Sequence, residues 1–152
     1  MRVENNLLMS DIPGNCIRFA NFAGMEIPPY NPAGKRNFCI DILDEEFAKQ
    51  LAETGWNIRY DNKERPDGVV YPPNLKVEIK YTDRSRPRIM MEQEGNKVWL
   101  DEQTLGDLDD MEIIRIKDIE IRPYNWEIRG ETGVTAYLKA MRIEVARDMF
   151  CD

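Results

Sequence analysis

The sequence predicts a mainly β protein, in which a twisted antiparallel sheet of about seven strands closes into a barrel and carries one helix. Three observations support this prediction. Apolar residues come in short alternating runs, turn residues separate these runs, and only residues 44–54 have helical spacing. With 152 residues the chain fits one domain. Residues 1–14 are expected to form an N-terminal extension and residues 147–152 a short tail.

The first predicted strand lies in "NCIRFANFAG", where Ile17, Phe19 and Phe22 are apolar and the alternation shifts phase near Ala20 or Asn21. The prolines and glycine of "MEIPPYNPAGKR" predict a loop, and "NFCIDIL" predicts the next strand. The chain therefore begins its sheet with two short strands.

The one expected helix follows. Asp44 is a suitable N-cap, a stripe of Phe47, Ala48 and Leu51 provides the apolar face, and Gly55 ends the helix.

Further segments complete the predicted sheet. "WNIRY" predicts a strand, and after the loop "DNKERPDGVVYPPN" the segment "LKVEIKY" alternates between apolar residues and lysine or glutamate. "RPRIMMEQEGNKVWL" predicts a hairpin turning at residues 94–96, and two long strands follow, joined at residues 130–133.

Composition narrows the function. The absence of histidine removes the commonest general base, and the three cysteines lack the spacing of a zinc site. No apolar run approaches the roughly 20 residues of a membrane helix, so we expect a cytoplasmic protein. The net charge of −7 is uneven. Residues 101–120 hold eight acids and two bases, whereas residues 76–90 hold five bases and two acids, which favours a local anion-binding face.

Two patterns carry chemistry. Asp67, Glu78 and Lys80 match the spacing of PD-ExK nucleases, in which two carboxylates hold Mg²⁺ and a lysine orients water. The alternative is a solvated strand face of alternating charge. A nuclease of this class also needs more helices than the sequence predicts.

The second pattern interleaves aromatic and basic residues. On the last strand Val134, Ala136, Leu138 and Ala140 form the core face, so Tyr137 and Lys139 are expected to project outward together. Tyr60 with Arg59, Trp99 with Lys97, and "RSRPR" are comparable groups. Single-stranded nucleic acids bind such surfaces, although tyrosine and tryptophan also fill cores and rims.

Tyr124 and Trp126 share parity with Ile128, which predicts that this pair packs in the core. Pro123 beside them suggests a strand edge or a bulge.

Four segments are distinctive: "GMEIPPYNPAGKRNFCIDI", "AETGWNIRY", "LDEQTLGDLDDMEI" and "RPYNWEIRGETGVTAYLKAM", in this order between about Asn15 and Val145. Together they resemble a family of bacteriophage single-stranded DNA-binding proteins with an OB fold. The resemblance implies an OB-like barrel that coats single strands in phage replication or recombination in the cytoplasm of the infected bacterial host. It implies no catalysis and no cofactor. Many such proteins end in an acidic tail that recruits partners, whereas this chain ends in "ARDMFCD". Two explanations stay open: the acidic tail has been truncated, or the acidic residues 101–112 take its place.

The leading hypothesis is therefore a sequence-independent single-stranded DNA-binding protein, with RNA, oligomeric state and protein partners left open. The expected stacking residues are Tyr137, Tyr60 and Trp99, with Tyr81 ranked lower. The expected phosphate contacts are Arg84, Arg86, Arg88, Lys80, Lys139, Lys35 and Arg36. The alternatives are the nuclease and a non-catalytic phage interaction or inhibitor protein that uses the acidic residues 101–120.

Overall fold

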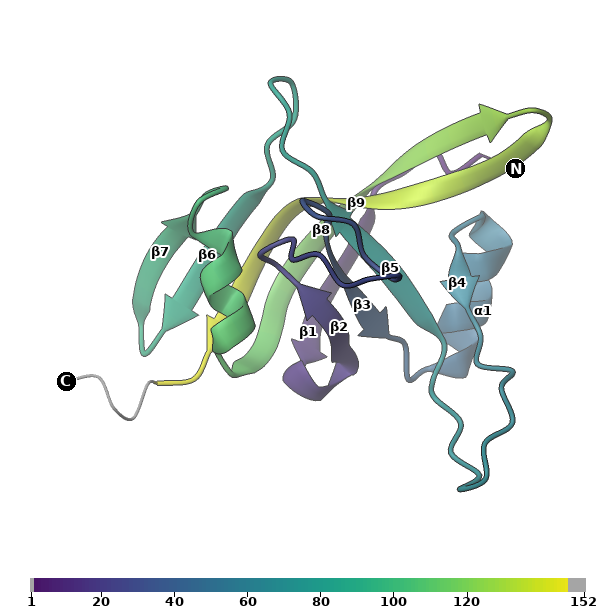
Figure 1. The fold of residues 1–152 in the computed structure, drawn as a ribbon, viewed down its shortest axis with the longest axis horizontal. Helices are drawn as coiled ribbons and strands as arrows, with labels where there is room; N and C mark the ends of the chain where they lie inside the picture. Colours follow the sequence, from purple (N-terminus) through teal and green to yellow (C-terminus); the bar gives the residue numbers. More distant parts are fainter. Residues whose placement is uncertain (1, 148–152) are drawn as a thin grey trace.

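The computed structural model describes residues 2–147, so most of the expected C-terminal tail, residues 148–152, lies outside the described residues. Nine strands, one α-helix and two short 3-10 helices make up this part of the chain (Figure 1). In chain order they are β1 (Leu7–Pro13), η1 (Gly14–Cys16), β2 (Ile17–Asn21), β3 (Arg36–Asp41), α1 (Glu45–Thr54), β4 (Ile58–Arg59), β5 (Asn74–Ile79), β6 (Arg88–Gln93), β7 (Asn96–Leu100), η2 (Leu105–Asp110), β8 (Ile113–Ile128) and β9 (Glu131–Val145).

All nine strands belong to one sheet with the order β1-β8-β9-β5-β3-β2, while β4 pairs with β5, and β6 pairs with both β7 and β9. The mainly β, OB-like fold with one helix is confirmed. Several details differ from the sequence prediction, including nine strands within residues 2–147 where about seven are predicted. The pairings of β9 with β5 and with β6 are parallel, and the path of paired strands within residues 2–147 is open, with β1 at one end and β2 at the other.

Strand β1 lies in the segment that sequence patterns place in an N-terminal extension. It pairs antiparallel with β8, with Leu7 opposite Ile121 and Ile12 opposite Ile116, and both β1 residues are buried. The sequence "LLMSDIP" does not show the alternation of a regular strand. In the structure Asp11 has a φ of 52°, in the left-handed region, and this conformation interrupts the alternation of buried and exposed residues. Residues 7–13 are thus part of the sheet.

The N-terminal segment also contacts the far end of β8. The Val3 amide donates to Asn125 Oδ1, and Asn125 Nδ2 donates back to the Val3 carbonyl oxygen, each over 2.9 Å. Figure 1 shows this segment running beside the outer half of the β8–β9 hairpin, which extends as an arm beyond the rest of the sheet.

Helix α1 forms as its sequence predicts. Asp44 Oδ1 accepts hydrogen bonds from the amides of Glu46 and Phe47 at 3.0 and 3.1 Å, which satisfies two of the free N–H groups of the first turn. Gly55 ends the helix with a φ of 118°, a conformation that favours glycine. Within residues 2–147 no helix is long and apolar enough to cross a membrane.

Both hairpin turns use two residues with positive φ, as tight hairpins require. Glu94 and Gly95 form the first turn, at the predicted place. Arg129 and Gly130 form the second, which begins before the predicted residues 130–133 because Thr132 and Gly133 still pair with β8.

Candidate nucleic-acid interface

The outward face of β5, β9 and β8 collects the polar residues of three adjacent strands. On β5, Leu75, Val77 and Ile79 are buried, so Lys76 and Glu78 point to the other side. Glu78 is opposite Tyr137 on β9, and Tyr137 is opposite Arg122 on β8. Residues paired in this way share a face, so one row of side chains crosses the sheet from Glu78 through Tyr137 to Arg122.

Two tyrosines meet on this face. The rings of Tyr124 and Tyr137 lie edge to face, with centroids 5.9 Å apart and an interplanar angle of 65°. Tyr137 is half-buried and points away from the core, as its parity predicts, while the neighbouring Leu138 is buried. The Tyr124 side chain is 51% exposed.

The prediction that Tyr124 and Trp126 belong to the core face is wrong. Ile119 and Ile121 are buried, so the even-numbered residues that follow on β8 face outward. Ile128, on which the parity argument rested, is 62% exposed near the hairpin tip. Trp126 does pack, but on the outward face, where its half-buried indole covers Gly133 of β9.

Cations surround the tyrosine pair. The Arg122 guanidinium carbon lies 5.4 Å from the centroid of the Tyr137 ring, and Lys80 Nζ lies 6.0 Å from it. Partial burial raises the pKa of the Tyr137 hydroxyl, with a further contribution from the Glu78 carboxylate. The Tyr137 ring therefore stays neutral and has two cations close to it.

A depression of about 290 Å³ opens beside Tyr137. Lys35, Arg36 and Lys80 line it together with Tyr81 and Glu102. Arg36 is held in place, because its Nη1 donates to the Phe22 carbonyl oxygen at 3.0 Å and its Nη2 to that of Glu102 at 2.9 Å. The guanidinium also lies over the Tyr81 ring, 5.6 Å from its centroid.

Two further depressions adjoin the first. One shares Lys80 and Tyr137 with it and adds Arg122 and Tyr124, and the other shares Glu78. The six cations lining the three are Lys35, Arg36, Arg59, Lys76, Lys80 and Arg122, and the two acids are Glu78 and Glu102. Six positive and two negative charges leave a net charge of +4, on a chain whose net charge is −7. We call this continuous surface the basic face.

Arg88 and Trp99 form a second aromatic–cation pair on the β6–β7 hairpin. The Arg88 guanidinium carbon lies 5.0 Å from the centroid of the Trp99 indole, which is 57% exposed. Arg88 is opposite Ala140 on β9, so the pair lies further along the strand that carries Tyr137. A rise of about 3.3 Å per residue puts Ala140 about 10 Å from Tyr137 along β9.

The remaining predicted phosphate contacts divide into two groups. Arg84 and Arg86 are exposed in the loop between β5 and β6, which connects the basic face to the Arg88–Trp99 pair. Lys139 is exposed beside Tyr137, but its Nζ lies 3.4 Å from Glu120 Oε2, so an internal carboxylate competes for its charge.

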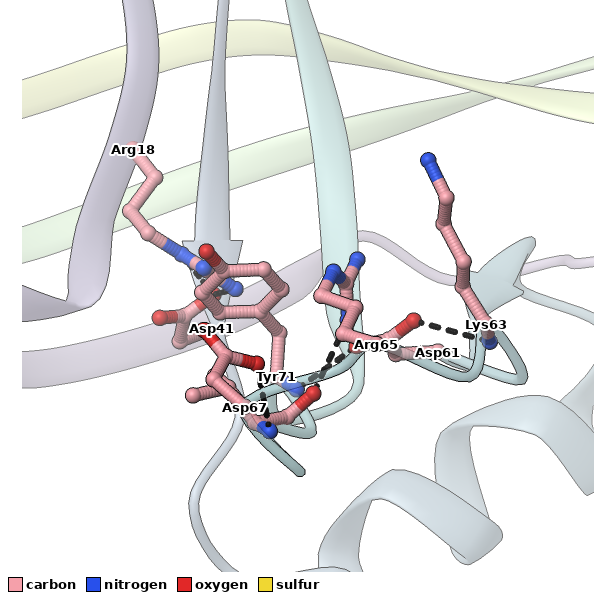
Figure 2. Close-up of polar contacts among 8 residues, drawn as sticks. Arg18, Asp41, Asp61, Lys63, Arg65, Asp67 and Tyr71 are labelled. Carbon is pink, nitrogen blue, oxygen red and sulfur yellow. Dashed lines mark hydrogen bonds and ion pairs between the residues drawn. The ribbon is translucent and has the colours of Figure 1, made fainter.

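Tyr60 is not brought together with Tyr137. It lines a separate groove with Leu43 and Lys49, next to α1 and the loop between β4 and β5. In this loop the Tyr71 ring lies between two guanidinium groups (Figure 2), with the Arg18 and Arg65 carbons 4.4 and 4.5 Å from its centroid.

Carboxylates hold both of these arginines. Arg18 donates to Asp41 Oδ1 at 2.7 Å, and Arg65 donates to Asp61 Oδ2 at 2.6 Å. Asp61 also accepts from the Tyr71 amide, and these hydrogen bonds, the one from Arg65 first, lower its pKa to about 2. This network fastens the loop to the sheet, which assigns these arginines a structural role.

The nuclease pattern is not assembled around one site. Asp67 lies in the same loop, where its Oδ1 accepts from the Val69 amide at 3.0 Å. Figure 1 shows that this loop extends beyond the start of β5, whereas Glu78 lies near the end of that strand. Within residues 2–147 no group of three or more Cys, Asp and Glu side chains could hold a metal ion.

Part of the acidic segment is tied into the fold by a carboxylate. Asp109 accepts from the amides of Phe22 and Ala23 at 2.9 and 2.8 Å, which ties η2 to the end of β2.

Sequence reasoning missed two groups of the basic face. The sequence prediction omits Arg122 and Tyr124 because it takes the face of β8 from Ile128 instead of from Ile119 and Ile121. Arg59 and Lys76 line the face but were not among the predicted contacts. The signal for Arg122 and Tyr124 is the hairpin register, which places them on the same face as Tyr137.

Comparison with known proteins agrees with this fold. Three solved structures of the single-stranded DNA-binding protein from bacteriophage Enc34 resemble it. The complex with ssDNA has a TM-score of 0.57 and 10% identity, covering 96% of this chain and 89% of that one. A C-terminal truncation of that protein has a TM-score of 0.55 and 12% identity, and the match covers 95% of this chain and 88% of that one. A further structure of that protein has a TM-score of 0.54 and 10% identity, and the match covers 97% of this chain and 84% of that one.

No curated protein sequence matches the chain. A family model does: residues 2–151 match the one described as "Putative phage ssDNA-binding domain". Because this match spans nearly the whole chain, the protein belongs to that phage single-stranded DNA-binding domain family.

Proposed function

We propose that the protein binds single-stranded DNA without a recognition sequence, through the basic face, during phage replication or recombination in the host cytoplasm. The observation that carries the proposal is the tyrosine pair, Tyr124 and Tyr137, which lines one depression with Lys80 and Arg122 on a surface of net charge +4. Family membership supports it, as does the shared fold with an Enc34 protein whose structure is described as a complex with ssDNA.

The chemistry follows from the two kinds of side chain. Aromatic rings stack on bases of any sequence, at about 1–3 kcal/mol per base, while lysine and arginine neutralise phosphates. Tyr137 and Tyr124 supply the rings, and Lys35, Lys80 and Arg122 line the phosphate track beside them. The loop with Arg84 and Arg86 continues this track to Arg88 and Trp99, where a further base stacks.

Bases must be unpaired to stack on these rings, so the surface selects single strands over duplex. Fluorescence anisotropy with a labelled oligo-dT and a duplex of the same length, at several salt concentrations, tests this selection. We expect tighter binding of the single strand and a loss of affinity as salt rises. Equal affinity for both, or none for the single strand, would refute the proposal.

A matched pair of charge reversals locates the site. Arg122→Glu removes a cation beside Tyr137, and Lys49→Glu makes the same change of charge on α1, outside the three depressions. We expect a large loss of affinity only for Arg122→Glu. Equal losses would mean that overall charge, and not the basic face, determines binding.

We further propose that the protein is not a nuclease. Glu78 and Lys80 belong to the basic face, and Asp67 is bonded within its own loop. Incubating labelled single-stranded and duplex DNA with the protein and Mg²⁺ or Mn²⁺ should leave both intact. Cleavage that disappears in Glu78→Ala would overturn this proposal.

A further inference from the structure

Glu78 places a carboxylate in the middle of the basic face. It lines two of the three depressions and stands opposite Tyr137 in the pairing of β5 with β9. Its side chain is 25% exposed, and Lys76 Nζ, 4.0 Å from Oε1, is its ion-pair partner among the described residues. No side-chain hydrogen bond to the Glu78 carboxylate is formed within residues 2–147, so its oxygens are available as acceptors.

A carboxylate at this place is unfavourable for a phosphate, because like charges repel. It is favourable for the N–H groups of a base edge, which an ionised carboxylate accepts strongly. Neighbouring strands lie about 4.8 Å apart, so a base stacked on Tyr137 brings its polar edge within reach of Glu78. The face thus separates the two parts of a nucleotide, with cations for the phosphate and Glu78 for the base.

The four bases differ in what they offer to a carboxylate. Guanine presents two adjacent donors, N1–H and N2–H, which match the two carboxylate oxygens. Adenine and cytosine present one exocyclic amino group each, next to a ring acceptor. Thymine presents N3–H between two carbonyl oxygens, which repel the carboxylate.

We propose that Glu78 accepts hydrogen bonds from the base stacked on Tyr137 and gives the basic face a preference for guanine over thymine at this one position. This inference rests on the proposed function. It adds a local base preference to a surface that otherwise tolerates any sequence.

The test measures affinities for three labelled oligonucleotides of about 12 residues, a length within the range of OB-fold sites. The first is oligo-dT, the second has one central dG, and the third has deoxyinosine there, which lacks the N2 amino group. For the wild type we expect about tenfold tighter binding with dG than with dT, a typical value for a bidentate contact, and an intermediate value with deoxyinosine.

Two variants make the test specific. Glu78→Gln keeps the shape but replaces one acceptor oxygen by a donor, so the dG-to-dT ratio should fall to about one, while oligo-dT binds more tightly because one negative charge leaves the basic face. Glu53→Gln makes the same charge change on α1 and should keep the ratio. Thermal unfolding of each variant confirms that it is folded.

The outcomes separate the inference from the function on which it rests. Binding of all three oligonucleotides with equal affinity, or a dG preference that persists in Glu78→Gln, would overturn the role of Glu78 and leave the proposed function standing. No binding of any of the three by the wild type would refute the proposed function, and the inference with it.

Discussion

Replacing Tyr137 by alanine separates binding from folding, because this residue and its neighbour Leu138 point to opposite sides of β9. Tyr137 is half-buried on the outward face, where its main aromatic contact is the edge-to-face pair with Tyr124. Leu138 is 4% exposed in the core. The two substitutions therefore remove side chains from two different environments.

Tyr137→Ala is expected to weaken DNA binding and to lower stability only a little, whereas Leu138→Ala is expected to lower stability more strongly. Losing one stacked base costs about 1–3 kcal/mol of binding free energy, which is a 5- to 150-fold weaker affinity for oligo-dT. Losing the tyrosine pair costs about 0.5–1.5 kcal/mol of stability, and at about 2–4 °C per kcal/mol for this chain length the melting temperature falls by about 1–6 °C. Leu138→Ala costs about 2–5 kcal/mol, or about 4–20 °C.

Fluorescence anisotropy with oligo-dT and thermal unfolding by circular dichroism measure the two quantities. Tyr137→Phe keeps the ring and should bind oligo-dT almost as the wild type does. If Tyr137→Ala lowers the melting temperature as much as Leu138→Ala does, Tyr137 is a structural residue. If it keeps full affinity, the base does not stack there.

Three further predictions concern salt, packing and pH. The affinity falls as salt rises, and Lys80→Ala should make the slope of log affinity against log salt less steep by about 0.7, the value for one lost phosphate contact on a single strand. An unchanged slope would mean that Lys80 does not contact a phosphate. Gly133→Ala would place a Cβ against the Trp126 indole, so we expect a shifted tryptophan emission and about 1–3 kcal/mol lower stability in urea; wild-type values would show that the arm adjusts freely. Lys117 Nζ, 2.9 Å from Glu92 Oε2, lowers the pKa of Glu92 below its ordinary 4.5, so this pair stabilises the fold above about pH 4.5 and the stabilisation is lost as the pH falls through the lowered pKa. Glu92→Gln should therefore lose less stability than the wild type between pH 7 and pH 3, measured by urea unfolding, and an equal loss would contradict this assignment.

The helix and the hairpins could be predicted because their signals are local. Asp44 and Gly55 bracket α1 in the sequence, and Glu94-Gly95 is a turn signal between two alternating segments. The parallel neighbours of β9 could not be predicted in this way. The pairing of Glu78 with Tyr137 joins residues far apart in the chain, and no turn between them records it.

The site was predicted in part for the same reason. Tyr137 was assigned to the outward face from the regular pattern of its own strand, and the structure places it there. Tyr124 was assigned wrongly because the alternation of β8 was read from Ile128, close to the exposed tip, where an apolar residue carries no information about the core. The neighbouring Arg59 makes Tyr60 a candidate in the sequence, but β4 is only two residues long and leads into a different groove.

The hydrogen bonds between Val3 and Asn125 have a consequence for the order of folding. They join residues 122 positions apart, and β1 itself pairs with β8. During synthesis at about 5–20 residues per second, Val3 therefore waits roughly 6–24 s until Asn125 is made. Leu7 and Ile12 stay exposed to solvent until the strand that covers them has left the ribosome. The first part of the sheet to be synthesised is thus among the last to be completed, and newly made chains are most exposed to aggregation during this interval.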